Sequence, residues 1–211
     1  AIDRDAFVDQ LYGLGIRSNS FIGPEVSGYD KSAEKYGYNY HPEKAKEIIK
    51  KHGWQGKKIH MLVANREEYM KMGQIVQDML KKVGLNVHME TMEWGTFLDV
   101  SKQGKYDITF LGWANSTADG SELLYPNLGA DNKGSTNVVF YDNPKFDRLV
   151  ADSRFTVNQQ KREKILDKAN KMAIKDAPWI VMYDNTVTLA YRDRVKGLVA
   201  SPTDQWFLYN V

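Results

Sequence analysis

The stretch Tyr106-Asp-Ile-Thr-Phe-Leu111, followed by Gly112-Trp-Ala-Asn-Ser-Thr117, predicts a short strand that runs into a polar turn. Apolar residues alternate along the first part, as in a half-buried strand, and Gly112 ends the pattern. The turn then presents one large aromatic side chain and three small hydrogen-bonding ones. Nothing in the turn is typical of catalysis, so we interpret it as a place where a ligand is held.

The residues upstream of this turn predict a parallel sheet. Residues 58–63 and 85–91 have the pattern of strands, and residues 66–83 between them repeat apolar side chains at spacings of three and four. A strand, a helix and a second strand in this order form a βαβ unit. A further helix over 94–103 and the strand over 106–111 extend the unit. Open α/β sheets bind ligands at the carboxyl ends of their strands, which is where the polar turn begins.

The rest of the chain predicts further helices and two more strands, with no internal repeat and no linker. The expected helices cover residues 2–11, 42–52, 121–128, 144–153 and 158–175, the expected strands cover 178–183 and 186–191, and residues 13–40 are expected to form a long surface loop. In the last helix, Ile165, Ala169, Met172 and Ala173 are expected to face inward. We therefore expect an α/β fold in which residues 1–211 form a single lobe.

Composition excludes several classes of function. The 211 residues include 29 basic and 27 acidic side chains, scattered along the chain, and the formal net charge is +2. No basic stripe with interleaved aromatics is evident, so nucleic acid is not an expected partner. The absence of cysteine rules out disulfides, thiolate catalysis and cysteine-bound metals. No apolar run approaches the roughly 20 residues of a membrane span, and no segment resembles a signal peptide.

Two loops are expected to leave the carboxyl ends of the sheet together and to form a ligand site. One contains Asn65 and Arg66, and the other covers residues 113–119. The free N–H groups at the start of the helix, with Arg66 beside them, would favour a carboxylate. In the alternative interpretation, Arg66 is a solvated charge that pairs with Glu67 or Glu68.

The side chains of the second loop have the chemistry to bind a peptide. Trp113 could stack on a ligand backbone or could fill the core of the lobe. Asn115, Ser116 and Thr117 can donate and accept hydrogen bonds to amides and to peptide termini, or can form an ordinary polar turn. Asp119 is the nearest acid in this loop.

The sequence predicts no catalytic, metal or cofactor site. Glu93, Asp107 and Asp119 are the only acids near the proposed edge, and Glu93 is expected to cap the following helix. There is no Gly-x-Ser-x-Gly elbow, so we expect no enzyme activity. The four histidines are not spaced three or four apart, which argues against a zinc or nickel site; they are His41, His52, His60 and His88.

A series of short motifs along nearly the whole chain carries a family resemblance. They are Ala1-Ile-Asp-Arg-Asp-Ala6, Gly28-Tyr29, Tyr40-His-Pro-Glu-Lys-Ala45, Lys82-Val-Gly84, Glu93-Trp94, Phe97-Leu98, Gly104-Lys-Tyr-Asp107, Gly112-Trp113, Asp142-Asn-Pro144 and Ala177-Pro-Trp-Ile180. In this order they resemble the extracytoplasmic solute-binding proteins of the oligopeptide, dipeptide and nickel class (family 5) of ABC importers.

The resemblance implies a periplasmic-binding-protein fold of the peptide-binding class (type II), with a mixed sheet flanked by helices. The chain would be the C-terminal lobe of a longer two-lobed receptor, and the N-terminal lobe, the hinge, the signal and any lipid anchor would lie outside it. It would hold a peptide, or a peptide-like solute such as glutathione, in the cleft between lobes and deliver it to the transmembrane subunits of an ABC permease. The expected location is extracytoplasmic.

One position departs from the family pattern. In the family the tryptophan of the turn lines the ligand cleft, and many members have an aspartate three residues later that pairs with the peptide amino group. This chain has Ser116 there. The sequence Trp-Ala-Asn-Ser-Thr-Ala-Asp is similar to the glutathione-binding branch. The alternatives from other classes are a small-molecule hydrolase or a sensor domain built on the same lobe, and a protein-interaction module.

Overall fold

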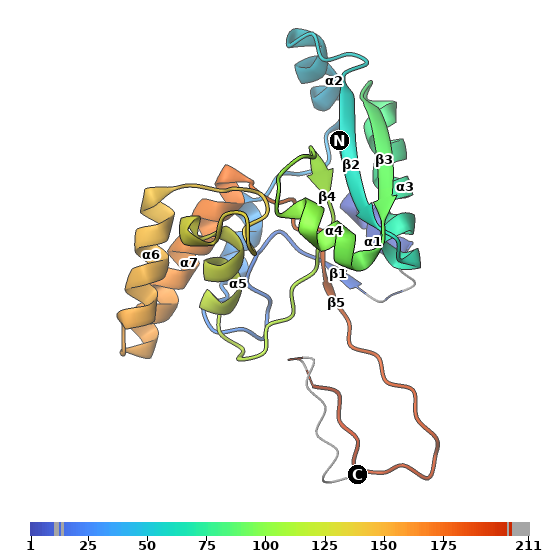
Figure 1. Cartoon of the computed structure of the whole chain (residues 1–211). Coiled ribbons are helices and arrows are strands. Elements are labelled where there is room, and N and C mark those ends of the chain that lie inside the picture. The colour runs from blue at the N-terminus through green and yellow to red at the C-terminus, as the bar shows by residue number, and fades with distance from the viewer. Residues whose placement is uncertain (11–12, 14, 202, 204–211) are drawn as a thin grey trace.

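A three-stranded parallel sheet forms one part of the molecule in the computed structural model, which describes residues 1–10, 13, 15–201 and 203 (Figure 1). The strands are β2 (Lys58–Ala64), β3 (Asn86–Met92) and β4 (Ile108–Thr109), in the order β3-β2-β4. β2 pairs in parallel with both neighbours. The predicted βαβ unit is thus confirmed, although β4 is shorter than the expected strand over 106–111.

Helices cover both faces of this sheet, because successive side chains of β2 point to opposite sides. Helix α3 (Glu67–Lys82) packs on the face that carries Met61 and Val63. Helix α4 (Trp94–Ser101) covers the other face, where Phe97 packs against Leu62 and Ala64. The Glu93 carboxylate accepts the backbone N–H of Gly95 at 2.8 Å and caps α4, as expected.

A group of helices forms a second hydrophobic core beside the sheet (Figure 1). It consists of α5 (Ser121–Leu128), α6 (Pro144–Phe155), α7 (Gln159–Asp176) and the short 3₁₀ helices Lys31–Tyr36 and Ala130–Asn132. Ala169 and Ala173 are buried on α7, as predicted, whereas Leu166, and not Ile165, is the buried residue of the preceding turn. Helix α2 (Pro42–Lys51) precedes β2 and begins with proline at its first position.

Residues near the start of the chain meet residues 183–185 in a small antiparallel sheet. Strand β1 (Gly15–Arg17) pairs with β5 (Tyr183–Asn185), and helix α1 (Arg4–Asp9) lies beside β1. The buried guanidinium of Arg4 donates to the carbonyls of Ser18, Tyr38 and Val181 at 2.7–3.0 Å. This antiparallel sheet of β1 and β5 is separate from the parallel sheet of β2, β3 and β4.

Several expected boundaries were wrong. Of the two expected C-terminal strands, over 178–183 and 186–191, only Tyr183 lies in a strand, and the other two residues of β5 fall between the expected strands. A strand requires a neighbour for its hydrogen bonds, and no described strand lies beside β5 past Asn185. The expected loop over 13–40 contains β1 and the 3₁₀ helix Lys31–Tyr36. Within the described residues, no helix has both the length and the apolar character needed to span a membrane.

Candidate functional site

The carboxyl ends of β2 and β4 lie next to each other. Met61 is in register with Ile108 and Leu62 with Thr109, so the residues after both strands leave the same edge of the sheet. The backbone N–H of Asn65 donates to the Met92 carbonyl at 2.6 Å, which fixes the first residue after β2. Asn65, Arg66 and Trp113 are all exposed at this edge.

Arg66 rests on an aromatic platform built from α3 and α4. Its guanidinium carbon lies 3.8 Å from the centre of the Trp94 ring. Trp94 in turn stacks with Tyr69, with ring centres 6.2 Å apart and planes inclined by 20°. The Tyr69 hydroxyl hydrogen-bonds the backbone of Gly112, the residue before Trp113, so the platform connects the two loops. A guanidinium held over a ring but exposed to solvent can still bind a carboxylate with two hydrogen bonds.

Trp113 is not a core residue. Its side chain is 41% exposed, and it belongs to none of the hydrophobic clusters formed by the described residues. Of the two interpretations drawn from the sequence, the geometry favours a ring that faces outward at the sheet edge. Such a ring offers a flat surface for stacking.

Ser116 and Thr117, although exposed, both form hydrogen bonds with Glu122 in the first turn of α5. The Glu122 carboxylate accepts both backbone N–H groups, from Ser116 at 3.0 Å and from Thr117 at 2.7 Å. It also accepts both hydroxyls, the Thr117 hydroxyl at 2.6 Å. Burial alone would raise the pKa of Glu122, but these hydrogen bonds outweigh it and lower that pKa to about 2. The two hydroxyls are therefore occupied in shaping the loop.

Asn115 and Asp119 close the other side of this loop. The Asn115 side chain donates to the Asp119 carbonyl at 2.7 Å and accepts the Asp119 N–H at 3.1 Å. The Asp119 carboxylate forms a two-point ion pair with Arg162 of α7, with Nη2 and Oδ1 2.8 Å apart, and also accepts the Ser121 hydroxyl. Burial would raise the pKa of Asp119, but Arg162 and Ser121 together hold it below the usual value.

Sequence reasoning missed Glu122 and Arg162, which hold the loop in place. The role of Glu122 could have been predicted from the local sequence, because an acid in the first turn of a helix often accepts hydrogen bonds from the residues before it. The role of Arg162 could not, because Arg162 lies 43 residues from Asp119 along the chain. The structure thus places Asn65, Arg66 and Trp113, all exposed, just after the ends of β2 and β4, and it engages the polar side chains of residues 115–119 in hydrogen bonds within the chain.

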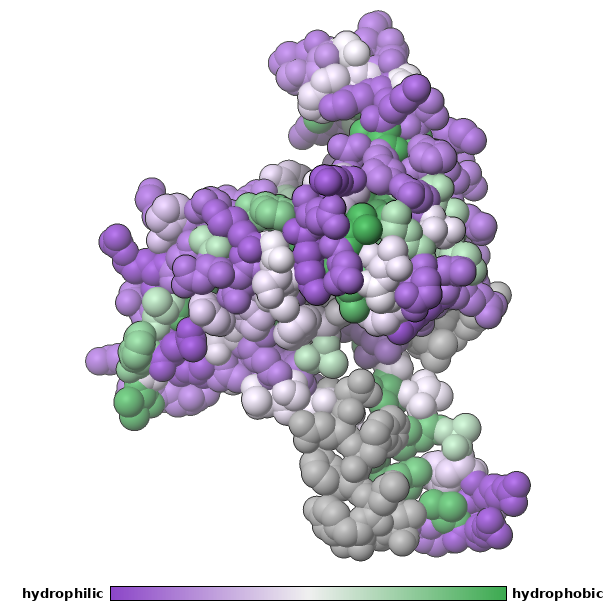
Figure 2. Space-filling model, in the orientation of Figure 1, coloured by the Kyte–Doolittle hydropathy of each residue, from purple (hydrophilic) through white to green (hydrophobic). Residues whose placement is uncertain are grey.

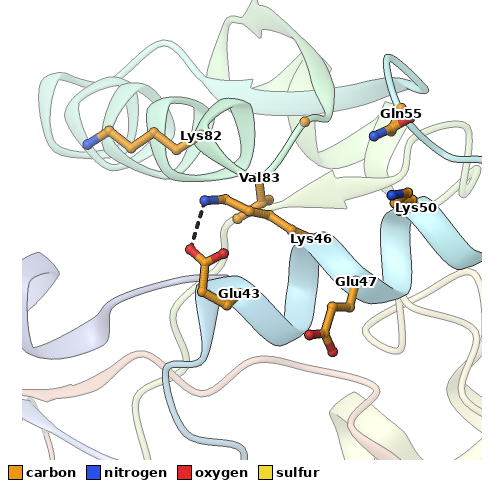
Figure 3. Close-up of a pocket in the computed structure, with 8 residues that line it drawn as sticks. Glu43, Lys46, Glu47, Lys50, Gln55, Lys82 and Val83 are labelled. Atoms are coloured by element: carbon orange, nitrogen blue, oxygen red, sulfur yellow. Dashed lines mark hydrogen bonds and ion pairs between the residues drawn. The ribbon is translucent and has the colours of Figure 1, made fainter.

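Two hollows of the surface lie away from this edge. One pocket of about 350 Å³ lies between α2 and the end of α3 and is lined by charged side chains that include Glu43, Lys46, Lys50 and Lys82 (Figure 3). Lys46 pairs there with Glu43 at 2.8 Å. Across the described residues, no group of three or more His, Asp or Glu side chains could hold a metal ion.

Relatives of known name match along the whole chain. Heme-binding protein A of Haemophilus influenzae is 26% identical over 218 residues, and the dipeptide-binding protein of Escherichia coli is 27% identical over 220. Each match covers all of this chain but only 40% and 41% of the relative, so the chain spans about two fifths of their length. The oligopeptide-binding protein OppA of Bacillus subtilis is 25% identical. These relatives are binding proteins by name, which supports the prediction that the chain is not an enzyme.

Solved structures agree with the fold. The periplasmic binding protein DppA of Helicobacter pylori, in complex with the peptide STSA, has a TM-score of 0.78 and 27% identity and covers 86% of this chain and 36% of its own. HbpA2 of Haemophilus parasuis has a TM-score of 0.86 over 99% of this chain and 42% of its own, at 23% identity. The expected periplasmic-binding-protein fold is confirmed.

Residues 1–135 match the family model described as "Bacterial extracellular solute-binding proteins, family 5 Middle". This match covers more than half of the chain. The chain therefore belongs to the family 5 bacterial extracellular solute-binding proteins.

Proposed function

We propose that this chain is the C-terminal ligand-binding lobe of a two-lobed receptor that captures a peptide or a peptide-like solute for an ABC importer. In this proposal the cleft lies between this lobe and the N-terminal lobe of the same polypeptide, outside the cytoplasm. The loaded receptor delivers the solute to the transmembrane subunits of the permease.

The observation that carries the proposal is the exposed edge with Trp113 beside the Arg66–Trp94 platform. The edge offers one flat aromatic surface and one guanidinium, which suit a peptide backbone and a carboxylate. A two-lobed site would cover this edge from the opposite side and exclude water. Relatives named as dipeptide-binding and oligopeptide-binding proteins support a ligand of this class.

Ser116 and Thr117 can offer a ligand the acceptor sites of their hydroxyls, since each hydroxyl already donates its proton to Glu122. The resemblance to the glutathione branch rested on these hydroxyls, and both donate to Glu122. Glutathione still carries two carboxylates that Arg66 could bind, so it stays a candidate. The Haemophilus influenzae relative is named for heme, which makes heme the third ligand to test.

Calorimetry on the complete receptor tests the proposal. The titrants are a panel of dipeptides, tripeptides and longer peptides, with glutathione and heme as separate arms. We expect binding in at least one peptide or glutathione arm. If the folded receptor bound neither a peptide nor glutathione, the proposal would be contradicted. Recovery of a hydrolysed or modified ligand would favour the hydrolase alternative.

A matched pair of tryptophan variants tests the role of the edge. Trp113→Ala should weaken binding of the preferred ligand by about 1–3 kcal/mol through lost stacking area. Trp54→Ala is the control, because Trp54 is 42% exposed, close to the 41% of Trp113, and follows α2 on another part of the surface. Equal affinity in both variants, or a large loss of stability in Trp113→Ala alone, would remove Trp113 from the site.

A further inference from the structure

Helix α7 gathers lysines in a single row, although the chain as a whole is nearly neutral. The row consists of Lys161, Lys164, Lys168, Lys171 and Lys175. Their spacings alternate between three and four, so on a helix of 3.6 residues per turn they fall within an arc of about 80° and extend over about 21 Å. The buried residues of α7 lie on the opposite side, so the row faces away from the core.

The row is only partly neutralised. Lys171 pairs with Asp167 at 2.7 Å and lies 3.5 Å from Asp30. No carboxylate partner is found among the described residues for the other four lysines of the row, Lys161, Lys164, Lys168 and Lys175. At the far end of the row, the Lys175 ammonium lies 4.4 Å from the centre of the Tyr36 ring. A hollow of about 300 Å³ lies between Tyr36 and the last three lysines, and Met172 and Asp176 line it as well.

The near end of the row adjoins an exposed apolar tip. Phe155, the last residue of α6, is 87% exposed, and Val157 in the turn to α7 is 99% exposed. Figure 2 shows hydrophobic surface at this end of the α6–α7 pair, at the lower left. Two adjacent apolar side chains directed into water on one turn are unusual and often mark an interaction site.

The turn that carries this tip is held rigidly. The Thr156 hydroxyl donates to the Asp152 carbonyl at 2.7 Å, and the Asn158 side chain accepts the Lys161 N–H at 3.0 Å. Arg162 donates to the Ser153 carbonyl at 2.9 Å and so ties the end of α6 to α7. Phe155 and Val157 are thus presented by an ordered turn, and the cations Arg154 and Lys161 flank them.

We propose that the apolar tip and the lysine row together form a docking surface for an anionic phospholipid bilayer. A bilayer accepts a protruding phenylalanine without a complementary pocket, and each lysine near an anionic surface adds about 1 kcal/mol of attraction. A straight row of flexible ammonium groups suits a flat surface of mobile phosphates. An acidic protein surface is the other partner that the row fits, but the apolar tip would then need a matching cavity.

Vesicle co-sedimentation of the complete polypeptide, without any attached acyl chain, tests this proposal. The vesicles are phosphatidylcholine alone and phosphatidylcholine with phosphatidylglycerol. We expect binding to the anionic vesicles only, and its loss at about 1 M salt, where charges are screened beyond about 3 Å. No binding to either vesicle, or equal binding to both, would overturn the proposal. Binding of an acidic protein in detergent without binding to vesicles would also overturn it.

Two triple variants with the same loss of charge separate the row from general charge. Lys161→Gln, Lys164→Gln and Lys168→Gln together should weaken vesicle binding about 100-fold. Lys50→Gln, Lys51→Gln and Lys82→Gln, on α2 and α3, should leave it close to that of the unaltered protein. An equal loss in the two triple variants would contradict a specific surface.

The apolar tip has a separate spectroscopic test. Phe155→Trp adds an indole at the tip, and brominated phospholipids quench an indole that enters the acyl region. We expect additional quenching in this variant relative to the unaltered protein, and about tenfold weaker binding for Phe155→Ser. Absence of additional quenching, or unchanged binding of Phe155→Ser, would show that the tip does not enter the bilayer.

Discussion

Glu122 is the residue that determines the shape of the Trp113 loop. One carboxylate accepts four hydrogen bonds from Ser116 and Thr117, and a second carboxylate, that of Asp119, is held by Arg162. The polar residues that the sequence offers to a ligand are therefore used to keep the loop in one conformation. Trp113 begins this loop, and the two carboxylates hold the residues that follow it.

The stability contributed by Glu122 should depend on pH. Its pKa is about 2 in the folded chain against an ordinary value of 4.5, so its contribution is complete above about pH 4.5 and is lost as the pH falls toward 2. Because the side chain is partly solvated, we expect Glu122→Gln to cost about 1 kcal/mol at neutral pH and almost nothing near pH 2. Urea unfolding at a series of pH values measures this difference.

Glu25→Gln is the matched control for this experiment. Glu25 is exposed, and its carboxylate makes no hydrogen bond to the described residues. Its replacement should change stability little at any pH. A pH-independent cost of Glu122→Gln would mean that shape, and not charge, is what the loop requires from this residue.

The amino group of the ligand should not depend on a carboxylate in this loop. Position 116 is serine, and the Asp119 carboxylate is occupied by Arg162 and Ser121. Loss of a buried ionic partner typically costs about 3–5 kcal/mol, more than 100-fold in affinity. N-acetylation of the preferred ligand should cost the complete receptor much less than this.

Asp119→Asn distinguishes the remaining possibility. We expect the ratio of affinities for free and acetylated ligand to be the same in this variant and in the unaltered receptor. A loss of about 1,000-fold on acetylation that Asp119→Asn abolishes would show that Asp119 binds the amino group in the closed receptor.

At the scale of elements, strongly periodic helices could be predicted from the sequence and short strands could not. The expected helices over 42–52, 66–83 and 158–175 agree with α2, α3 and α7 to within two residues, because their apolar positions repeat and their ends carry proline, glycine or asparagine. In contrast, β1 has only three residues, and β5 pairs with it from the far end of the chain. A pairing across about 170 residues leaves no local pattern to detect.

The segment around Gly28 joins α7 to the Trp113 loop. The Ser27 N–H donates to the Ala118 carbonyl at 2.9 Å, and the Ser27 carbonyl accepts the Gly120 N–H at 3.0 Å. Gly28 has a φ of +94°, and a Cβ placed there would lie 2.7 Å from the Leu166 Cβ. The position therefore requires glycine for its backbone conformation and for the close approach of α7.

Gly28→Ala should destabilise the chain by about 2–4 kcal/mol, the combined cost of a left-handed alanine and a clash in the core. Gly53→Ala isolates the first cost, because Gly53 has a φ of +66° and no neighbouring atom within 4 Å of the position that a methyl group would take. We expect that control to cost about 1 kcal/mol. Urea unfolding midpoints of the two variants give the comparison, and equal costs would mean that α7 moves to accommodate the methyl group.

At the scale of the whole molecule, the sheet and the helical group have separate cores, and the edge with Trp113 faces open solvent. Fold class and the positions of Asn65, Arg66 and Trp113 at the strand ends followed from the order of strands and helices along the sequence. The hydrogen bonds of residues 116–119 could not be predicted in this way, since they depend on Arg162 and Glu122 in neighbouring helices. The role of these residues in binding stays a prediction, as does the single-lobe organisation.

The 211-residue chain expressed alone should fold cooperatively but should bind peptides or glutathione weakly or not at all. A ligand in a closed cleft typically has most of its surface buried, and a single lobe offers only about half of the contacts. An exposed edge also leaves its hydrogen bonds and the Arg66 charge in competition with water, which weakens each of them.

Calorimetry with the same panel on the isolated chain and on the complete receptor measures the difference. Unfolding of the isolated chain, followed by circular dichroism in urea, verifies that weak binding is not a failure to fold. Sub-micromolar affinity in the isolated chain would mean that this lobe holds a complete site, and the second lobe would then serve a purpose other than completing the ligand's contacts.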